Sequence, residues 1–542
     1  MTKVSVTRGK YPTLFGGIGF QNNEAILYPL IEKEHFDQVL CKCFREISPG
    51  YMRTFAGYDD WTRESMDAFA EYYEKMQKWT DTPMYFAAAK GKIHFSDEEI
   101  TEYCERVADN LAYLKKEKGV NHIRYYCVSN EMSQGTWGDF LKDLPLFKKY
   151  HEGFYRAFQN RGLDIGLLAT DASEYWYWDS MDWAIENMNR ITEDYCLHIY
   201  EREHTIFDPT LYEFFYNKCA EYVEKAIRAD NKRLILGEFG MQKMSDVDTE
   251  QLGFSKGITI DTNRWHDDDF ERAYYGLGIT DMTFAAINAG VFMLGIWTFT
   301  DYPDPYSCAY AEKDEYAVKW SKVEKFISGT TDAKYNKHGL FRWEDDGDYS
   351  VKEFYWCLAP LIKLFKRNSK VLDIETENEL LHCCGIMNRN GSVSVGIVNR
   401  NKEDTEITLD SNLFNKNIRV YEYDPRNVPQ NDFGDIQDYS TVLDKDNPTF
   451  TLKAESVTFF TTDYVEKEAP VKAKKVCISD NTLYWEEVED KNHCYYRVYA
   501  GDNKDFVPSR DNQIASTVAT DLPIKDESLF YKVLSVDIYG NV

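Results

Sequence analysis

The sequence is poor in basic residues and in grouped cysteines, and both shortages exclude classes of function. Its 542 residues include 63 Lys and Arg against 91 Asp and Glu, a formal net charge of −28. A chain this acidic repels phosphate backbones, and no basic patch interrupts it, so we expect no nucleic-acid partner. The twelve cysteines form no CxxC pair and no Cys/His cluster. We interpret them as free buried thiols in a reducing compartment, and the sequence indicates no metal site and no cofactor.

Long apolar runs are also scarce. The segment Met1–Gly17 has no apolar core of a secretory signal, so we expect a cytoplasmic protein, or a secreted one whose leader has been removed. The longest uncharged run, Met282–Thr300, approaches the length of a membrane span, but Asn288, Gly290 and Gly295 interrupt it. We predict the end of a buried helix followed by a buried strand, and no membrane segment. The oligomeric state is left open.

Short apolar segments that alternate with helical patterns fill the chain from about residue 10 to residue 366. With 43% hydrophobic residues the chain can build a large core and is expected to form two or three domains. Helices are predicted at Glu64–Trp79 and at Asp97–Lys116, the second with a capping box from Ser96 to Glu99. The strand candidates are Leu14–Phe20, Tyr51–Phe55, Met84–Ala89, Ile123–Ser129, Ile165–Thr170, Tyr195–Tyr200, Leu234–Phe239 and Val291–Phe299. Eight such units fit a (β/α)8 barrel, an α/β fold whose active sites lie at the carboxyl ends of the strands.

The pattern changes near residue 370 to short strands with polar turns. Ser392–Arg400, Ile418–Asp424 and Glu455–Thr462 alternate in period two and predict a β-sandwich over residues 367–466. Lys467–Pro470 is interpreted as a linker. The remaining segment, 469–542, resembles a fibronectin type III module, with Trp485 as its core tryptophan. We therefore expect a (β/α)8 catalytic barrel over residues 10–366, followed by two β domains.

Two glutamates end predicted barrel strands. The strand in Ile123–Ser133 turns polar at Ser129, Asn130 and Glu131, and a second apolar run, Arg233–Met241, ends on Glu238. A buried carboxylate without a partner is costly, so packing alone does not account for acids at these positions. Hydrolysis of a glycosidic bond requires a carboxylic acid and a carboxylate on opposite sides of the sugar, and facing strands of a barrel can supply them.

Other polar or aromatic side chains on the predicted strands have two interpretations. Arg53 lies inside the second strand and is expected to point into a polar barrel mouth. His198 and Tyr200 share one face of the sixth strand, and Trp297 ends the eighth. His198 is equally explained as a hydrogen-bonded core residue, and Trp297 as a core tryptophan.

The loops that follow the strands are rich in aromatic residues, whose rings stack well on the C–H faces of sugars. They include Tyr58, Trp61, Trp137, Tyr175, Trp176, Tyr177, Trp178, Trp265, Tyr302, Tyr306 and Tyr310. One acidic run, Asp267–Asp269 after His266, could suggest a metal. It is better explained as the N-cap and negative first turn of the helix that follows it.

Taken together, these residues resemble the clan A glycoside hydrolases, the 4/7 barrels. The resemblance covers roughly residues 10–366 and consists of Asn130-Glu131 on strand four and Glu238 on strand seven, with Arg53, His198, Tyr200 and Trp297 in the same order on strands two, six and eight. The following sandwich resembles the companion domain of families 39, 30, 51 and 79. The sequence departs from many members in one respect, since Met132 stands where they carry proline.

The resemblance implies a retaining mechanism on a glycoside or oligosaccharide. Glu131 would be the general acid/base and Glu238 the nucleophile. Asn130 would bind the sugar 2-hydroxyl, and Trp297 would be the platform beneath the sugar at the cleavage point. Arg53 and Tyr200 would hold Glu238 ionised and oriented, because an adjacent cation lowers the pKa of a carboxylate. His198 is expected among the substrate-binding residues.

Two rival hypotheses remain at this point. A catalytically silent barrel could bind carbohydrate or a protein through its aromatic loops, although such a protein would not need both glutamates. A metal-dependent hydrolase or an aldolase would require several strand-end histidines with a carboxylate, or a strand-end lysine. Of these, the sequence offers only His198.

Overall fold

The computed structural model describes residues 1–10, 13–22, 31–55, 61–78, 80–87, 96–132, 138–202, 208–242, 272–303, 335–336, 338–343, 348–428, 430–466, 472–490 and 492–542. Several predictions fall outside these ranges and are not tested by the structure. They are the aromatic residues Tyr58, Trp137, Trp265, Tyr306 and Tyr310, the run His266–Asp269 and the linker Lys467–Pro470.

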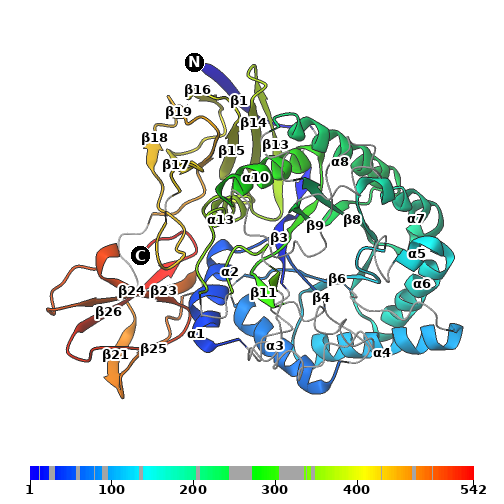
Figure 1. The fold of residues 1–542 in the computed structure, drawn as a ribbon, viewed down its shortest axis with the longest axis horizontal. Coiled ribbons are helices and arrows are strands. Elements are labelled where there is room, and N and C mark those ends of the chain that lie inside the picture. Colours follow the sequence, from blue (N-terminus) through cyan, green and yellow to red (C-terminus); the bar gives the residue numbers. More distant parts are fainter. Residues whose placement is uncertain are drawn as a thin grey trace.

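The sequence predicts a closed parallel barrel, and Figure 1 shows it, surrounded by helices, on the right of the molecule. Within the described residues, its eight strands pair in the order β10-β3-β4-β5-β6-β7-β8-β9. Their bounds are β3 (Gly17–Gln21), β4 (Met52–Phe55), β5 (Met84–Ala87), β6 (Ile123–Cys127), β7 (Gly166–Ser173), β8 (Asp194–Arg202), β9 (Leu234–Gln242) and β10 (Met293–Ile296). Each overlaps a predicted segment, and β7, β8 and β9 extend two or three residues beyond the predicted carboxyl end. Leu14 and Phe15, predicted as the start of the first barrel strand, form a separate strand β2 (Leu14–Phe15) that pairs with β13 (Ser369–Thr376) outside the barrel.

Helices pack around the outside of the barrel. They are α1 (Lys33–His35), the π-helix η3 (Phe36–Leu40), α2 (Cys41–Ile47), α3 (Arg63–Gln77), α4 (Asp97–Lys116), α5 (Gly138–Lys142), α6 (Leu144–Arg161), α7 (Ser180–Met188), α8 (Leu211–Arg228), α10 (Arg272–Ala289) and α13 (Tyr355–Leu364), with short 3-10 turns η5 (Tyr175–Tyr177) and η6 (Asn189–Ile191). α4 begins and ends where the sequence predicts, and Ser96 and Glu99 form its capping box. The run Met282–Thr300 is the end of a helix followed by a strand, as predicted. Among the helices in the described part of the chain, none has the length and apolar character needed to span a bilayer.

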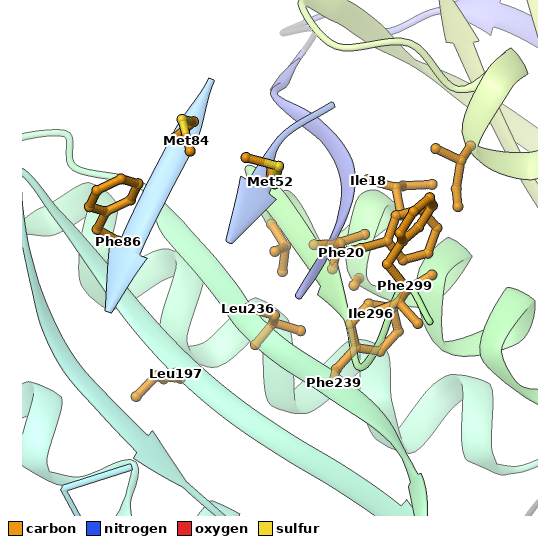
Figure 2. Packing of buried hydrophobic residues seen from close by; sticks show 14 of the residues in the cluster. Ile18, Phe20, Met52, Met84, Phe86, Leu197, Leu236, Phe239, Ile296 and Phe299 are labelled. Carbon is orange, nitrogen blue, oxygen red and sulfur yellow. The ribbon is translucent and has the colours of Figure 1, made fainter. Parts of the chain in front are cut away.

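Alternation along the barrel strands separates two cores. On β5, Met84 and Phe86 pack outward against the helices, whereas Tyr85 and Ala87 belong to the cluster inside the barrel. Figure 2 shows part of the outer cluster, in which side chains of β3, β4, β5, β9 and β10 gather. The inner cluster is rich in tyrosine and tryptophan. The hydroxyl groups of its tyrosines can hydrogen-bond to charged side chains that are buried beside them.

A β-sandwich lies beside the barrel and includes the N-terminal strand. Its strands pair in the order β18-β17-β20-β15-β14-β13-β1-β16-β19, and residues from both halves of this path share one core. Their bounds are β1 (Thr2–Arg8), β14 (Leu381–Met387), β15 (Val393–Asn399), β16 (Thr405–Asp410), β17 (Ile418–Tyr423), β18 (Thr441–Leu443), β19 (Thr449–Leu452) and β20 (Ser456–Thr461). The sequence did not predict β1, which pairs with β13 and β16. A small pair, β11 (Tyr302–Pro303) and β12 (Tyr335–Asn336), follows the last barrel strand.

The C-terminal module consists of two facing three-stranded sheets. One contains β21 (Lys474–Ser479), β22 (Thr482–Glu486) and β25 (Asp521–Pro523), and the other β23 (His493–Gly501), β24 (Gln513–Thr517) and β26 (Phe530–Asp537), with the 3-10 turn η9 (Arg510–Asn512) before β24. Trp485 lies in the core between them, with its ring edge-on to Tyr496. The limits between the three predicted domains remain predictions.

A buried ionic cluster joins the three parts of the molecule. Asp435, from the sandwich, is fully buried and lies 2.7 Å from Lys42 Nζ of α2 and 3.0 Å from Arg497 Nε of β23. Glu46 of α2 accepts hydrogen bonds from the backbone of Ile436 and from the Tyr495 hydroxyl. Breaking a buried ion pair leaves an uncompensated charge, so separating these parts would be costly. Figure 1 shows the C-terminal module beside α1 and α2 of the barrel.

Candidate active site

The two strand-end glutamates meet at the carboxyl end of the barrel. Glu131 follows β6 by a few residues, with a positive φ of 50° and a side chain that is 17% exposed. Glu238 lies within β9 and its side chain is only 4% exposed. One oxygen of each carboxylate and a ring nitrogen of His198 all lie within 4.8 Å of one another. A partly open acid therefore faces a buried one.

A bulge in β9 brings Glu238 to this position. Leu197 pairs with Leu236, but His198 pairs with Glu238, so Gly237 is an extra residue on β9. A Cβ atom at Gly237 would lie 2.5 Å from the Cys196 sulfur and 2.9 Å from His198 Nε2, so only glycine fits there. Bulges of this kind redirect side chains at barrel rims.

Arg53 of β4 donates hydrogen bonds to Glu238 and to three other side chains. Its guanidinium is fully buried and donates to Glu238 Oε1, to Gln21 Oε1 at 2.6 Å and to Asn130 Oδ1 at 2.7 Å. It also donates to Asp171 Oδ2 at 2.9 Å. The sequence prediction that Arg53 points into a polar barrel mouth is thus matched by its position. The rigid fork of arginine suits this role, because it serves several acceptors at once.

The remaining predicted residues surround the same point. The Tyr200 hydroxyl donates to Glu238 Oε2 at 2.7 Å. His198 Nδ1 lies 3.4 Å from Glu131 Oε1 and 3.8 Å from Glu238 Oε2, and its Nε2 lies 2.9 Å from Asp171 Oδ1. Trp297 is 5% exposed and belongs to the inner aromatic cluster, with its ring centroid 6.1 Å from that of Phe55. The structure therefore brings together all seven residues that the sequence singled out.

The charges at the site act on one another. Burial raises the pKa of Glu238, and Glu131 adds to this, whereas Arg53, His198 and the Tyr200 hydrogen bond lower it. Arg53 thus acts in the direction that the sequence predicts, but burial outweighs it and the pKa is raised overall. Burial by itself would lower the pKa of His198, but the nearby charges of Asp171 and Glu238 raise it to about 9. The surrounding carboxylates therefore favour the imidazolium form of His198 at neutral pH.

Two groups of side chains are close enough to suggest a metal ion, Glu131–His198–Glu238 and Asp171–Cys196–His198. The ligand atoms of these groups are already engaged with one another. Both ring nitrogens of His198 lie within 3.8 Å of a carboxylate oxygen, and the Cys196 sulfur accepts a hydrogen bond from the Tyr85 hydroxyl at 3.4 Å. Both oxygens of Glu238 already accept hydrogen bonds. We assign no metal to these residues.

The aromatic loop after β7 differs in part from the prediction. Trp178 is fully buried and donates its indole N–H to the His198 carbonyl oxygen at 2.9 Å, so it is a core residue. Trp176 remains 38% exposed, whereas Tyr175 and Tyr177 are half-buried. Within the described part of this loop, Trp176 is the only exposed aromatic residue.

Three polar residues at the site were not predicted. Asp171, Tyr85 and Gln21 are buried and contact Arg53 or His198 directly or through one another. Asp171 carries the same signal as Glu131 and Glu238, since an acid follows the apolar run Gly166–Thr170. It was missed because the predicted strand ends one residue earlier.

Comparison with known proteins gives similarity of structure without similarity of sequence. No family model matches the chain, and no curated protein matches it. Among solved structures, the catalytic domain of GH30 xylanase C from Talaromyces cellulolyticus has a TM-score of 0.54 at 11% identity, covering 85% of this chain and 99% of that one. The GH51 arabinofuranosidase from Xanthomonas axonopodis pv. citri has a TM-score of 0.54 at 13% identity, covering 85% and 100%.

A third similar structure includes the C-terminal module. The bacterial orthologue of human α-L-iduronidase has a TM-score of 0.57 at 13% identity and covers 100% of this chain and 98% of that chain. The other two cover 85% of this chain. The predicted resemblance to clan A glycoside hydrolases is confirmed for the fold, a parallel barrel followed by sheet-rich domains.

Proposed function

We propose that the protein is a retaining glycoside hydrolase that cleaves a β-glycosidic bond by double displacement. The observation that carries this proposal is the pair Glu131 and Glu238, whose nearest oxygens lie within 4.8 Å at the carboxyl end of the barrel. Retaining enzymes hold their carboxyl groups about 5 to 5.5 Å apart, whereas inverting enzymes need about 6.5 to 9.5 Å to admit a water. Two carboxylate oxygens within 4.8 Å of each other are compatible with the retaining separation and favour that mechanism.

In the first step Glu238 attacks the sugar and Glu131 acts as the acid. A carboxylate oxygen of Glu238 forms a bond to the anomeric carbon while the glycosidic C–O bond breaks. Glu131 transfers its proton to the departing oxygen, which leaves as an alcohol. The products are a covalent glycosyl ester on Glu238 and an ionised Glu131.

In the second step Glu131 acts as the base. It removes a proton from water while the water oxygen bonds to the anomeric carbon and the ester bond to Glu238 breaks. Glu238 returns to its carboxylate form and Glu131 to its acid form. Two inversions at the same carbon retain its configuration.

The contacts of the neighbouring residues support a proposed role for each. Arg53 and Tyr200 bind one oxygen each of Glu238 and fix the direction of its attack. Asn130 is held by Arg53 beside Glu131, where its amide can bind a sugar hydroxyl. We propose Trp297 as the platform beneath the sugar, because its ring belongs to the inner aromatic cluster beside Phe55. His198 would contribute a positive charge beside the two acids. The proteins of similar fold include two whose names specify a xylanase and an arabinofuranosidase, which supports a glycoside as substrate.

The alternative is a catalytically silent barrel that binds carbohydrate or a protein. A binding site does not require two acids within reach of one sugar carbon, one of them buried against an arginine. We therefore favour the enzyme, and the test below separates the two.

The test compares Glu238→Ala with Asp194→Asn, a buried acid at the other end of the barrel. On aryl β-glycosides of several sugars (gluco, galacto, xylo, fuco, arabino and glucurono), we expect the wild type to turn over at least one. Glu238→Ala should lose at least about 10³-fold in kcat, because it lacks the nucleophile, and azide should restore turnover and give an inverted glycosyl azide. Asp194→Asn should keep its activity. Wild-type activity in Glu238→Ala would overturn the nucleophile assignment, and an inactive wild type on every substrate would favour the silent barrel.

A further inference from the structure

The Asp171 carboxylate, next to the proposed catalytic pair, contacts side chains from three other barrel strands. Asp171, near the end of β7, is fully buried. Its Oδ2 accepts a hydrogen bond from Arg53 at 2.9 Å, and its Oδ1 accepts one from the Tyr85 hydroxyl and lies 2.9 Å from His198 Nε2. The three partners come from β4, β5 and β8. This carboxylate therefore links strands on both sides of it.

The backbone is shaped to place Asp171 there. Thr170 pairs with Cys196 and Ala172 with Leu197, so Asp171 is an extra residue in β7. Its φ is +59°, in the left-handed region that aspartate tolerates better than most residues. A bulge that turns one acid toward two cations is typical of a functional barrel rim.

Both cations that Asp171 holds reach the proposed catalytic glutamates with their other nitrogens. Arg53 uses one nitrogen for Asp171 and the other for Glu238. His198 directs Nε2 to Asp171 and Nδ1 toward Glu131 and Glu238. Asp171 thus acts on the catalytic pair through Arg53 and His198.

We propose that Asp171 is a positioning residue that fixes Arg53 and keeps His198 as an imidazolium whose Nδ1–H faces Glu131 and Glu238. This proposal rests on the proposed function for its effect on turnover, but its effect on His198 can be measured without activity. The imidazolium supplies a positive charge beside Glu131 while that residue is ionised, which is the state between the two steps.

The electrostatic surroundings agree with this geometry. The carboxylates nearest to the His198 ring are Asp171 from β7, Glu131 after β6 and Glu238 from β9, and the Cys196 sulfur lies close to the ring as well. Behind them, Arg53 from β4, Tyr85 from β5 and Tyr200 from the same strand as His198 hydrogen-bond to Asp171 or Glu238. Among the charges that raise the pKa of His198, Asp171 has the largest effect. His198 and Arg53 in turn hold the pKa of Asp171 well below its usual range against the effect of burial. Removing this single charge should therefore release the proton of His198 in the neutral range.

The first measurement uses the wild-type protein. In NMR titration of a sample with labelled histidines, His198 is identified by the signal that His198→Gln removes. We expect an imidazolium at about pH 7.5, with a midpoint near 9. A neutral His198 ring at that pH would overturn the proposal, whatever the variants do.

The second measurement uses Asp171→Asn, which keeps the shape of the side chain and removes its charge. We expect the midpoint of His198 to fall below about pH 7.5. The alkaline limb of kcat/KM should move up, because a neutral ring no longer stabilises the ionised form of Glu131, and kcat/KM at the optimum should fall by about 10- to 100-fold. A structural role alone would not shift the pH profile.

Asp194→Asn is the matched control, since Asp194 is also buried and bound by an arginine and a tyrosine. Its pH profile and the signal of His198 should match the wild type. If Asp171→Asn folds and shows a wild-type profile with a protonated His198, the proposal is wrong. If Glu238→Ala is fully active, the proposed function is wrong, and the NMR titration still decides the role of Asp171.

Discussion

The two ends of the barrel carry the same three residue types in different arrangements. At the carboxyl end, Arg53, Asp171 and Tyr85 form a buried group. At the amino end, Arg233 donates to both oxygens of Asp194 and to the Tyr125 hydroxyl. The Arg233 side chain is 35% exposed, whereas that of Arg53 is fully buried. The two ends therefore hold similar groups of an arginine, an aspartate and a tyrosine, with the arginine buried at one end and partly exposed at the other.

The difference lies in how many acids each arginine serves. Arg233 directs its ionic hydrogen bonds to one carboxylate, so it forms a single ion pair with Asp194. Arg53 divides its hydrogen bonds between Asp171 and Glu238, and Glu131 lies close by. A single ion pair is typical of a structural contact. Several acids around one arginine, with perturbed pKa values among them, are typical of functional sites.

Histidines near the two ends differ in the same way. His198 at the carboxyl end has its pKa raised to about 9, although burial alone would lower it. His151 of α6 is close to the start of β8 and contacts the Ile191 carbonyl oxygen and Thr192, and burial lowers its pKa to about 3. The surroundings at the carboxyl end favour the charged form of a histidine, and those of His151 favour the neutral form.

The largest expected contrast concerns Glu131. In Glu131→Ala, kcat/KM for glycosides with poor leaving groups should fall by about 10²- to 10⁴-fold, because such groups need a proton to depart, and activated aryl glycosides should lose far less. Asp194→Ala should affect both substrate types equally and only through stability. Equal losses on both substrate types in Glu131→Ala would contradict the acid role.

The second contrast exchanges the two arginines for lysine. Arg53→Lys should lose about 10²- to 10³-fold in kcat/KM, because an ammonium cannot reach Glu238, Asp171 and Asn130 together. Arg233→Lys should retain activity within about threefold and lower the apparent Tm. Steady-state kinetics and thermal denaturation measure the two effects. Similar activity in both variants would remove the distinction between the two ends.

The third contrast is stability against pH. The folded-state pKa of His198 lies above its ordinary value, so its contribution is complete below about pH 6.5 and is lost as the pH rises through about 9. His151 has a lowered pKa, so its contribution is present above about pH 6.5 and is lost as the pH falls toward 3. In apparent Tm profiles, His198→Gln should flatten the alkaline decline and His151→Gln the acid decline. Each slope corresponds to about 1.4 kcal/mol per pH unit. Unchanged slopes would show that other groups dominate.

The smallest contrast removes one hydroxyl at each end. Tyr85→Phe and Tyr125→Phe each delete a hydrogen bond to a buried aspartate and should each cost about 1 kcal/mol in stability. Only Tyr85→Phe should also lower kcat, since only Asp171 is linked to the catalytic pair. A kcat effect in Tyr125→Phe of the same size would contradict this.

Much of this arrangement could be predicted because barrel strands leave a strong local signal. Apolar runs that end on a carboxylate identify Glu131 and Glu238, and the order of the strands then places Arg53, His198, Tyr200 and Trp297 at one end. Alternation predicts which side chains point inward, and the capping box predicts where α4 begins.

The remaining features depend on long-range pairing that a local pattern does not carry. The bulges at Asp171 and Gly237 add one residue to a strand, and nothing in the apolar run shows the shift in register. β1 pairs with strands more than 360 residues further along the chain. The burial of Trp178 could not be distinguished from exposure, because the loop reads as four consecutive aromatic residues.

The most direct test of the central claim is to trap the covalent intermediate. A 2-deoxy-2-fluoro glycoside with an activated leaving group, of the sugar that the substrate screen identifies, should form the ester but hydrolyse it slowly. Mass spectrometry of a proteolytic digest should place the fluoroglycosyl group on Glu238 alone, and Arg53→Lys should slow its formation. A label on Glu131 or Asp171, or steady turnover with an unlabelled Glu238, would contradict the account.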